Sequence, residues 1–539
     1  MAAGAVRAET PLHERIDAAV GFGDAEFEKL AADDADDATF VRRIHLDLVG
    51  AVPDADRTRR FLQDDSPNKR AELIDQLLSS PQHARRMQYV FDAMLMERRP
   101  HKHIKSDEWR SYLRRSFLEN KPWDQLAVEI LTADGTDEKT RPAARFLLDR
   151  EMKIDAVTRD LGRMFLGRDL QCAQCHDHPN IDEYLQRHYH GLAAFLKRSY
   201  LFKDPKSKKA SIGEKAEGKV EFTSVFTGES GETAPRLLDL PPIEDPPLAD
   251  DPYQVKPKKN IRSVPVYSRR LQLGVAMTDP ANPAFRRNIA NRLWAMMMGR
   301  GIVEPVDMMH SDNPPSNPKL LDLLADALED HNYDMRFLLR ELALTKTYGR
   351  NSEYEGPVDE ASEGRFAVAV LKPLSPEQLA WSMMQAVGLT DQTLDRLKAK
   401  QLKADAKNGP KQVEDPLWRE AALHDALKSC VDAFASSFGV VGIQRRRFDA
   451  STNQALFLRN GKLVQSWLEA SGKRLTARLK NMEAPEFVDE FYMSIFSRRP
   501  TVVEAVYVTQ FLDENNDRDA AVRRLVWAAL SSAEFRFNH

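Results

Sequence analysis

The chain has 539 residues, a length that predicts more than one hydrophobic core, and its 42% hydrophobic and 30% charged residues are typical of globular proteins. A net charge of −4 shows no basic bias, which argues against nucleic acid as a partner. No apolar run reaches the roughly 18 residues that a membrane-spanning helix needs, so the sequence predicts no transmembrane segment.

Residues 1–38 form an N-terminal segment that lacks the apolar core of a signal peptide. It begins MAAGAVRAET, and the small residues up to Ala8 also fit the end of a shortened leader. Three cysteines are too few for a disulfide scaffold. One of them, Cys430, falls in the expected helix LHDALKSCVDAFASSF, where we expect a buried, inert thiol.

Residues 39–200 predict a run of helices, because apolar residues recur at steps of three and four. Near the end of this run, Val157, Leu161 and Phe165 form one apolar stripe, and Gly167 is a suitable residue to end that helix. We therefore expect a helical N-terminal domain.

Residues 201–268 have a different composition. Lys- and Gly-rich stretches flank KVEFTSVF, which is typical of a short strand, and the Pro-rich stretch LPPIEDPPLADDPYQVKPKK follows. The sequence predicts a small β element and an extended linker here.

Residues 269–539 return to a helical pattern and predict a second helical domain. Two helix starts are explicit in it. Ser375 and Gln378 are spaced as a capping box around a proline, and Asn317 precedes Pro318 at the start of a Leu-rich run.

The two ends of the chain resemble each other. FVRRIHLDLVGAVP begins at Phe40 and FVDEFYMSIFSRRP begins at Phe487, and each is followed later by a Leu-Ser-Ser sequence. Chance similarity between two amphipathic helix pairs broken by Pro is the alternative explanation. We expect residues 40–80 and 487–532 each to fold as a helical pair that bends near its proline.

The most specific feature of the sequence is CAQCHDHP, which begins at Cys172. Thiols three residues apart, at Cys172 and Cys175, can add to the two vinyl groups of one haem, and the adjacent His176 is then placed as an axial ligand of the iron. With 3 Cys and 13 His in 539 residues, a C-x-x-C-H run is expected by chance only about 4 × 10⁻⁴ times. The sequence therefore favours covalently bound haem c.

A non-haem metal site is the main alternative. Cys172, Cys175, His176 and His178 offer ligand types that zinc or iron accepts, and His190 can extend the set. Such closely spaced ligands rarely surround one ion, which argues against this interpretation. A redox-active dithiol is a third interpretation, although nothing upstream resembles a thioredoxin-type βαβ unit.

The other polar residues of the motif have several candidate roles. Because His178 lies two positions from His176, it cannot reach the opposite face of the same haem. It can contact a propionate, support the ligand or bind another metal, and a locally hydrogen-bonded histidine is the simpler interpretation. Asp177 can orient an imidazole N–H or remain a solvated turn residue.

A sixth iron ligand would decide between an electron carrier and an open site for small molecules. The nearest candidates beyond the motif are His190 and His188, and we expect His190 to lie closer to the open face than any Met of the second domain. Met164 belongs to an apolar stripe and is expected in the core.

At the motif the chain resembles a known pair of domains: a planctomycete cytochrome-like domain of unknown function and its companion PSD domain. The likeness is carried by CAQCHDHP, YHGLAAFL, FVRRIHLDLVGAVPDADRTRRFL and ENKPWDQLAVEIL for the first domain, and by NIANRLWAMMMGRGIVEPVD, KPLSPEQLAW and SSAEFRFNH for the second. It covers about residues 40–539. The resemblance implies export and a haem-type motif at Cys172, Cys175 and His176. Many relatives have an acidic residue where this chain has His188, so any role of that position is in doubt here.

These observations predict a mainly α-helical, multi-domain protein with a small β and linker insertion. As function we expect an exported c-type haem-binding protein with a redox or electron-transfer role in the periplasm or cell envelope, served by a redox partner that the motif does not specify. A zinc or iron enzyme and a structural or interaction protein of the envelope are the alternatives. Because the motif specifies a cofactor and no substrate, the sequence assigns no catalytic residue.

Overall fold

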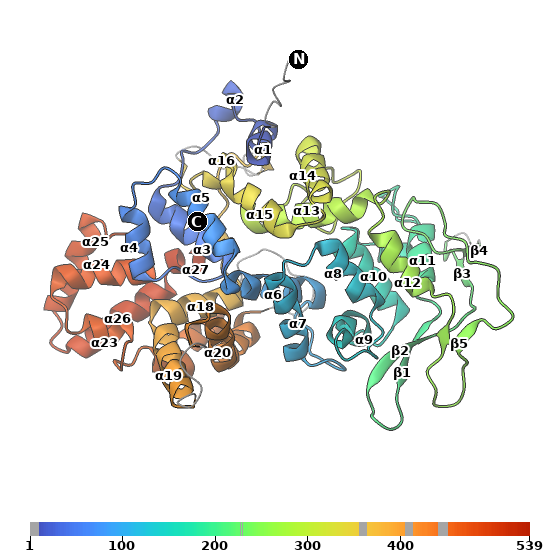
Figure 1. The fold of residues 1–539 in the computed structure, drawn as a ribbon. Coiled ribbons are helices and arrows are strands. Elements are labelled where there is room, and N and C mark those ends of the chain that lie inside the picture. The colour runs from blue at the N-terminus through green and yellow to red at the C-terminus, as the bar shows by residue number, and fades with distance from the viewer. Residues whose placement is uncertain (1–9, 227, 229, 355–363, 405–412, 440–450) are drawn as a thin grey trace, which may run out of the picture. The chain divides into compact units, whose positions relative to one another are not determined.

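The computed structural model describes residues 10–226, 228, 230–354, 364–404, 413–439 and 451–539 (Figure 1). Ala8 and the rest of the first nine residues lie outside this set. The chain forms two compact units: unit 1 comprises Met1–Phe27, Val90–Thr345 and Glu360–Phe366, and unit 2 comprises Glu28–Tyr89, Lys346–Asp359 and Ala367–His539. Helices account for 56% of the chain, so the mainly α prediction is confirmed.

Unit 1 contains the helices on either side of the β insertion and all of the labelled strands except β7 and β8. Its elements are α1 (Leu12–Val20), α2 (Ala25–Glu28), the second half of α6 (Pro81–Met96), α7 (Ser106–Leu118), α8 (Trp123–Thr132), η1 (Arg141–Ala144), α9 (Arg145–Leu148), α10 (Ile154–Phe165), η2 (Cys172–Gln174), α11 (Gln186–Ala194), β1 (Ser199–Lys203), β2 (Ala210–Glu214), β3 (Val220–Thr223), β4 (Ser230–Thr233), β5 (Tyr253–Val255), β6 (Val264–Pro265), α12 (Arg269–Met277), α13 (Pro283–Met298), α14 (Pro318–Asp330) and α15 (Met335–Leu344).

An aromatic cluster forms the centre of unit 1. The ring of Trp123 on α8 stacks on Phe165 of α10 and on Phe285 of α13, with ring centroids 5.7 Å and 5.9 Å apart. All three side chains are fully buried. Because each comes from a different helix, this cluster fixes α10 between α8 and α13.

The C-terminal end of α10 is held by side chains of α13. The side-chain N–H groups of Asn288 and Arg292 each donate to a carbonyl oxygen of the last turn of α10, both at 2.7 Å. Gly167 follows with φ +67°, the conformation expected of a glycine that ends a helix. Met164 is buried, as predicted. The segment that leads to the cysteines therefore leaves α10 in a fixed direction.

Buried charges reinforce this end of α10. Asp160 is fully buried and receives Arg99 and Arg150 at 2.8 Å and 2.7 Å. One turn later Arg163 pairs with Glu97 at 2.7 Å and with Asp307 at 3.0 Å. Since a buried charge without a partner is strongly destabilising, this network holds α10 to the end of α6 and to the loop after α13.

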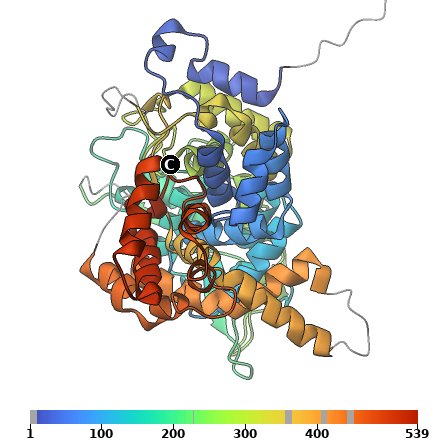
Figure 2. The same cartoon turned by 90° about the vertical axis from the view of Figure 1, so that its left-hand side faces the viewer.

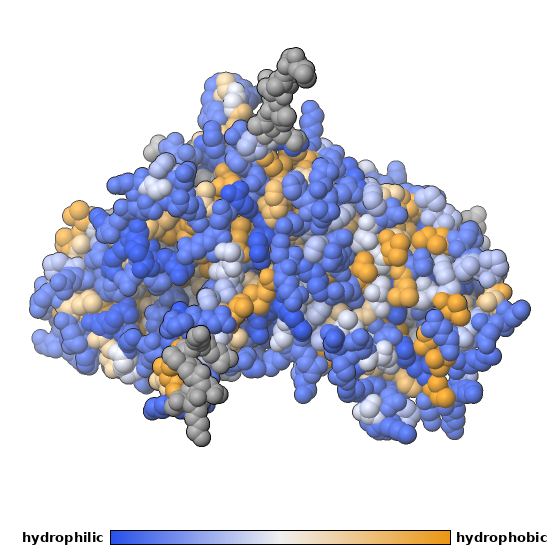
Figure 3. Space-filling view, in the orientation of Figure 1, coloured by the Kyte–Doolittle hydropathy of each residue, from blue (hydrophilic) through white to orange (hydrophobic). Residues whose placement is uncertain are grey.

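The predicted β insertion is present as antiparallel hairpins in unit 1. β1 pairs with β2, β3 with β4 and β5 with β6. The strand expected in KVEFTSVF is β3. Exposed apolar residues gather over β5 and α12 in the space-filling view (Figure 3). Val255 of β5 and Val275 of α12 are both exposed.

Unit 2 is almost entirely helical. Its elements are α3 (Asp37–Leu48), α4 (Ala55–Gln63), α5 (Lys69–Leu78), the first half of α6, α16 (Lys346–Gly349), β7 (Lys372–Pro373), α18 (Pro376–Ala386), α19 (Leu389–Ala404), α20 (Pro416–Phe438), α21 (Thr452–Asn460), α22 (Lys462–Trp467), α23 (Leu475–Leu479), α24 (Ala484–Ile495), α25 (Val502–Asp513), α26 (Arg518–Ser531), α27 (Ala533–Arg536) and β8 (Phe537–Asn538).

Two helix starts predicted from the sequence are confirmed. Ser375 and Gln378 form the capping box of α18. In unit 1, the Asn317 side chain accepts from the N–H of Leu320 at the start of α14. Cys430 on α20 is half-buried against the core of unit 2, and burial raises the pKa of its thiol, as suits an unreactive cysteine.

The repeat is visible in unit 2 as two runs of three helices, α3–α5 and α24–α26. In each run the first helix ends shortly before the proline, at Leu48 and at Ile495. Two residues beyond each helix end the chain has positive φ, +74° at Gly50 and +61° at Ser497. The predicted bend near each proline is confirmed, but each segment folds as three helices rather than as the predicted pair, because the chain breaks once more after α4 and after α25. α4 packs beside α24, so blue and red helices adjoin in both views (Figures 1 and 2).

None of the helices in the described part of the chain is both long and apolar enough to cross a membrane.

Candidate functional site

The two motif cysteines lie on one exposed turn of unit 1. η2 spans Cys172–Gln174, and the N–H of Cys175 donates to the carbonyl oxygen of Cys172 at 3.3 Å. Both thiols are exposed. A single tight turn therefore presents both sulfur atoms to solvent, where each is accessible for covalent attachment or oxidation.

His176 follows the turn with one ring nitrogen engaged. Its Nδ1 lies 2.7 Å from the carbonyl oxygen of Asp177, so this atom must carry the proton that it donates. In the neutral imidazole Nε2 then keeps its lone pair. This is the tautomer in which Nε2 can bind iron or zinc. The ring packs against Phe226 with centroids 4.4 Å apart.

His178 uses its ring differently. Its Nδ1 accepts hydrogen bonds from the backbone N–H groups of Asn180 and Ile181, at 3.2 Å and 3.1 Å. The proton of the neutral ring therefore lies on Nε2, and the lone pair of Nδ1 is taken up by these two hydrogen bonds. The carboxylate of Asp177 accepts from the N–H of Gln186 at the start of α11. Both residues thus shape the loop between η2 and α11.

α11 brings His190 to the cysteine turn. Its Nε2 lies 3.1 Å from the carbonyl oxygen of Gln174, and its ring stacks on Phe222 with centroids 4.8 Å apart and planes 6° apart. Burial is the main cause that lowers the pKa of His190, so the ring is neutral and donates its Nε2 proton to Gln174.

His188 lies apart from the turn. Its side chain is fully buried, with Nδ1 2.7 Å from the carbonyl oxygen of Glu183 and Nε2 2.9 Å from Asp239. Burial lowers its pKa, against the smaller raising effect of Asp239. Both ring nitrogens therefore face groups of the loops around α11.

The hairpin β3–β4 supplies aromatic residues that the sequence analysis missed. The N–H of Val225 donates to the carbonyl oxygen of Cys175 at 3.1 Å, which attaches the hairpin to the turn. Phe222 and Phe226 then lie against His190 and His176. Phe226 is 75% exposed and Val225 is 66% exposed. Exposed apolar residues in KVEFTSVF were the available signal, but nothing in the sequence connected them with the cysteines.

Within the described residues, no group of three or more His, Cys, Asp or Glu side chains is placed to hold a metal ion. Cys172, Cys175, His176 and His178 are neighbours in sequence, but the turn spreads their side chains. What the structure does bring together is an exposed thiol pair, one histidine with a free Nε2 and a set of aromatic rings.

The fold and the site define a mainly helical protein of two compact units with an exposed C-x-x-C-H turn. Residues 15–200 match the family model PSCyt2, a protein of unknown function (DUF1549), and residues 269–512 match PSD1, a protein of unknown function (DUF1553). The chain belongs to the proteins that carry these two domains in this order. No curated protein and no solved structure matches the chain.

Proposed function

We propose that this chain binds one haem covalently through Cys172 and Cys175, with His176 as an axial ligand, and acts as a redox or electron-transfer protein of the cell envelope. The observation that carries the proposal is the geometry of the turn. Both thiols are exposed on η2, and the contact of Nδ1 with Asp177 leaves Nε2 of the adjacent histidine free.

The surroundings of the turn suit a flat apolar group. Phe222, Phe226 and Val225 of the β3–β4 hairpin lie beside it, and two of these are largely exposed. Large exposed apolar side chains lose unfavourable contact with water when a ligand covers them. When bound, haem supplies one-electron chemistry, whereas these residues hold it and limit access of water.

The envelope setting rests on the resemblance to exported planctomycete domains, and covalent attachment suits it because it retains the cofactor. A zinc or iron site made by the same cysteines and histidines is the competing proposal. The spread of these ligands and the protonated Nε2 of His178 make it the weaker of the two.

The decisive experiment is export of the full chain, behind an added signal sequence, in a host with active cytochrome c maturation. We expect a pyridine-haemochrome spectrum and a haem-stained band that survives denaturation, because thioether bonds outlast unfolding. Cys172→Ala with Cys175→Ala should abolish the band.

Cys430→Ala is the matched control, since it removes the third cysteine, which lies in unit 2, and should leave the band unchanged. Stoichiometric zinc without a Soret band in the wild-type protein would overturn the proposal in favour of the metal site.

A further inference from the structure

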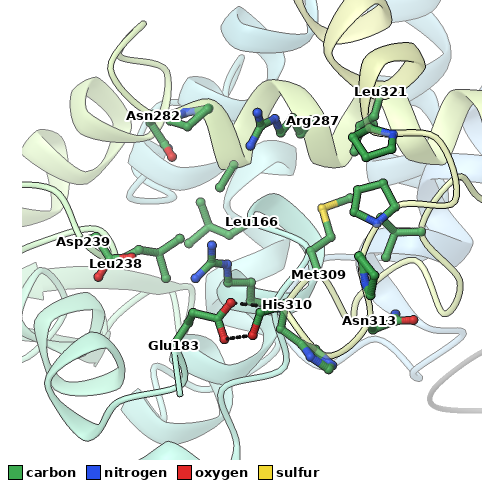
Figure 4. A pocket seen from close by; sticks show the side chains of 18 of the residues that line it. Leu166, Glu183, Leu238, Asp239, Asn282, Arg287, Met309, His310, Asn313 and Leu321 are labelled. Carbon is green, nitrogen blue, oxygen red and sulfur yellow. Dashed lines mark hydrogen bonds between the residues drawn. The ribbon is translucent and has the colours of Figure 1, made fainter. Parts of the chain in front are cut away.

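A cavity of about 530 Å³ lies within unit 1, away from the cysteine turn (Figure 4). Several stretches that are distant in sequence line it: the residues just after α10, Glu183, the loop Leu237–Leu240, the start of α13, and the chain from Val303 to Asp322, which includes the start of α14. Much of the lining is apolar and includes Leu166, Leu238, Met309 and Leu321, whose side chains surround the space in Figure 4. This volume is in the range of sites for small organic molecules.

Arg168 is the exceptional polar residue of this lining. Its Nε and Nη1 atoms are buried from solvent and have no hydrogen-bond partner in the described part of the chain. Because buried N–H donors without an acceptor are costly, such an arrangement is expected where a ligand supplies the acceptor.

The backbone places Arg168 firmly. Its N–H donates to the carbonyl oxygen of Gly162 at 2.9 Å, and it forms a bridge with Met308. A Cβ at Gly162 would lie 2.7 Å from the carbonyl oxygen of Arg168, so only glycine permits this close return of the chain onto α10. The position of Arg168 is therefore built into the fold.

Two of the carboxylates around the cavity already have partners. Glu183 accepts from the N–H and the hydroxyl of Ser311, at 2.7 Å and 2.8 Å. Asp322 pairs with Arg287 at 2.7 Å. The third, Asp239, is exposed; it lies 2.9 Å from Nε2 of His188, but no hydrogen bond forms there among the described residues. Arg168 attracts Glu183 electrostatically, but none of these carboxylates accepts a hydrogen bond from its Nε or Nη1 atom among the described residues.

Two further features favour negative charge in the cavity. Residues Asn282 and Ala284 at the start of α13 line it, and so does Pro318 at the start of α14. The N-terminal ends of helices carry partial positive charge and N–H groups without partners in the helix. Both therefore add to the potential that Arg168 creates.

We infer that this cavity binds a small organic anion, with a carboxylate on Arg168 and an apolar body against the leucines. This ligand site is separate from the cysteine turn and does not depend on haem. One aromatic ring connects the two regions, since Tyr184 contacts His178 of the motif loop and His310 of the cavity edge-on, at 5.9 Å and 5.4 Å. The ligand is therefore bound within reach of the motif loop.

Isothermal titration calorimetry with 4-phenylbutyrate and its uncharged counterpart 4-phenylbutanamide tests the inference on the full chain. We expect the carboxylate to bind at least about tenfold more tightly than the amide, because a charge-assisted hydrogen bond to the guanidinium is lost in the amide. Arg168→Gln should abolish this preference. Arg187→Gln removes the same charge from an exposed position on α11 and should keep it.

Two measurements guard against a folding artefact. Arg168→Gln removes two buried N–H donors that have no acceptor, so its unliganded thermal midpoint should equal or exceed that of the wild type. Ala284→Phe keeps Arg168 but fills the cavity, and it should weaken binding of the carboxylate. Equal binding of carboxylate and amide to the wild type, no carboxylate binding at all, or full carboxylate binding by Arg168→Gln would overturn the inference.

Discussion

The Nε2 atom of His190 lies 3.1 Å from the carbonyl oxygen of Gln174, the residue between the two cysteine positions that immediately precedes Cys175. This contact joins the middle of α11 to η2, and the stacked ring of Phe222 extends it to the β3–β4 hairpin. The cysteine turn is thus held by a helix and a hairpin rather than by its own sequence alone. Its geometry depends on residues up to about fifty positions away in the chain.

His178→Ala should loosen the loop that follows the motif. The variant removes the acceptor of two backbone N–H groups, those of Asn180 and Ile181. With about 1 kcal/mol per hydrogen bond, we expect amide exchange there to become roughly tenfold faster. Hydrogen-exchange mass spectrometry of a peptide that covers these two residues measures it.

His176→Ala is the control for this experiment, because among the described residues the His176 ring accepts no hydrogen bond from a backbone N–H group of the loop; it donates to the next carbonyl oxygen and packs on the exposed Phe226 ring. Unchanged exchange in His178→Ala would show that water replaces the ring without cost, and that His178 is not needed for the loop.

Ser497→Gly should stabilise unit 2. Ser497 has φ +61°, where a side chain is strained, and its fully buried hydroxyl has no hydrogen-bond partner among the described residues. Its counterpart in the first copy of the repeat is already glycine. After allowance for the greater flexibility of glycine in the unfolded chain, we expect a gain of about 1 kcal/mol, measured by urea unfolding.

The reverse exchange, Gly50→Ser, should cost about 1–3 kcal/mol, because its φ is +74° and a Cβ there would lie 2.9 Å from Cδ of Arg86. If both substitutions shift stability in the same direction, the two turns are not equivalent and the repeat does not extend to them.

The sequence predicts local features of this fold well. The capping box of Ser375, the end of α10 at Gly167 and the broken helices of the repeat all depend on residues close together in the chain. Partners distant in sequence were not predictable. Arginine is usually found on the exposed face of a helix. Arg42 is nevertheless fully buried and donates to the carbonyl oxygen of Ile495 at 3.0 Å.

The same limit applies to the sites. The motif identified Cys172, Cys175 and His176 because three reactive residue types are adjacent, a signal that needs no tertiary information. The cavity around Arg168 had no such signal, since its walls come from several separate stretches and its key property is that two nitrogens of Arg168 have no hydrogen-bond partner among the described residues. Only the packed structure shows this property.

Acid should weaken unit 2 through His45. This side chain is fully buried, and burial lowers its pKa from 6.5 to about 3. As the pH falls from about 6.5 toward 3, His45 is therefore protonated in the unfolded chain but not in the folded chain. The free energy of unfolding decreases over this pH range. Near pH 5 the loss approaches about 1.4 kcal/mol per pH unit.

His45→Asn removes this titration and can keep a donor for the carbonyl oxygen of Val41, which the ring Nδ1 now contacts at 2.7 Å. Between pH 6 and pH 5 we expect the variant to lose about 1 kcal/mol less than the wild type. Urea-dependent hydrogen exchange of unit 2 peptides measures both. Burial also lowers the pKa of His539, to about 4, but its effect on the pH dependence of stability is the same in both proteins. The difference between the two losses therefore reports on His45. Identical losses would mean that His45 is already protonated in the fold.

The last prediction concerns the role of His190. The sequence suggests it as a sixth iron ligand. In the structure, however, its Nε2–H donates a hydrogen bond to the carbonyl oxygen of Gln174, and its ring stacks on Phe222. Ligation through Nε2 would require the hydrogen bond to Gln174 to break. We therefore expect His190→Ala in the haem-loaded protein to leave the spin state unchanged in the absorption spectrum, and to speed amide exchange across η2 because the turn loses its support from α11.

His188→Ala is the comparison, since that buried ring contacts Glu183 and Asp239 and should affect exchange around α11 rather than in η2. A change from low-spin to high-spin iron in His190→Ala alone would contradict the positioning role and establish His190 as the sixth ligand.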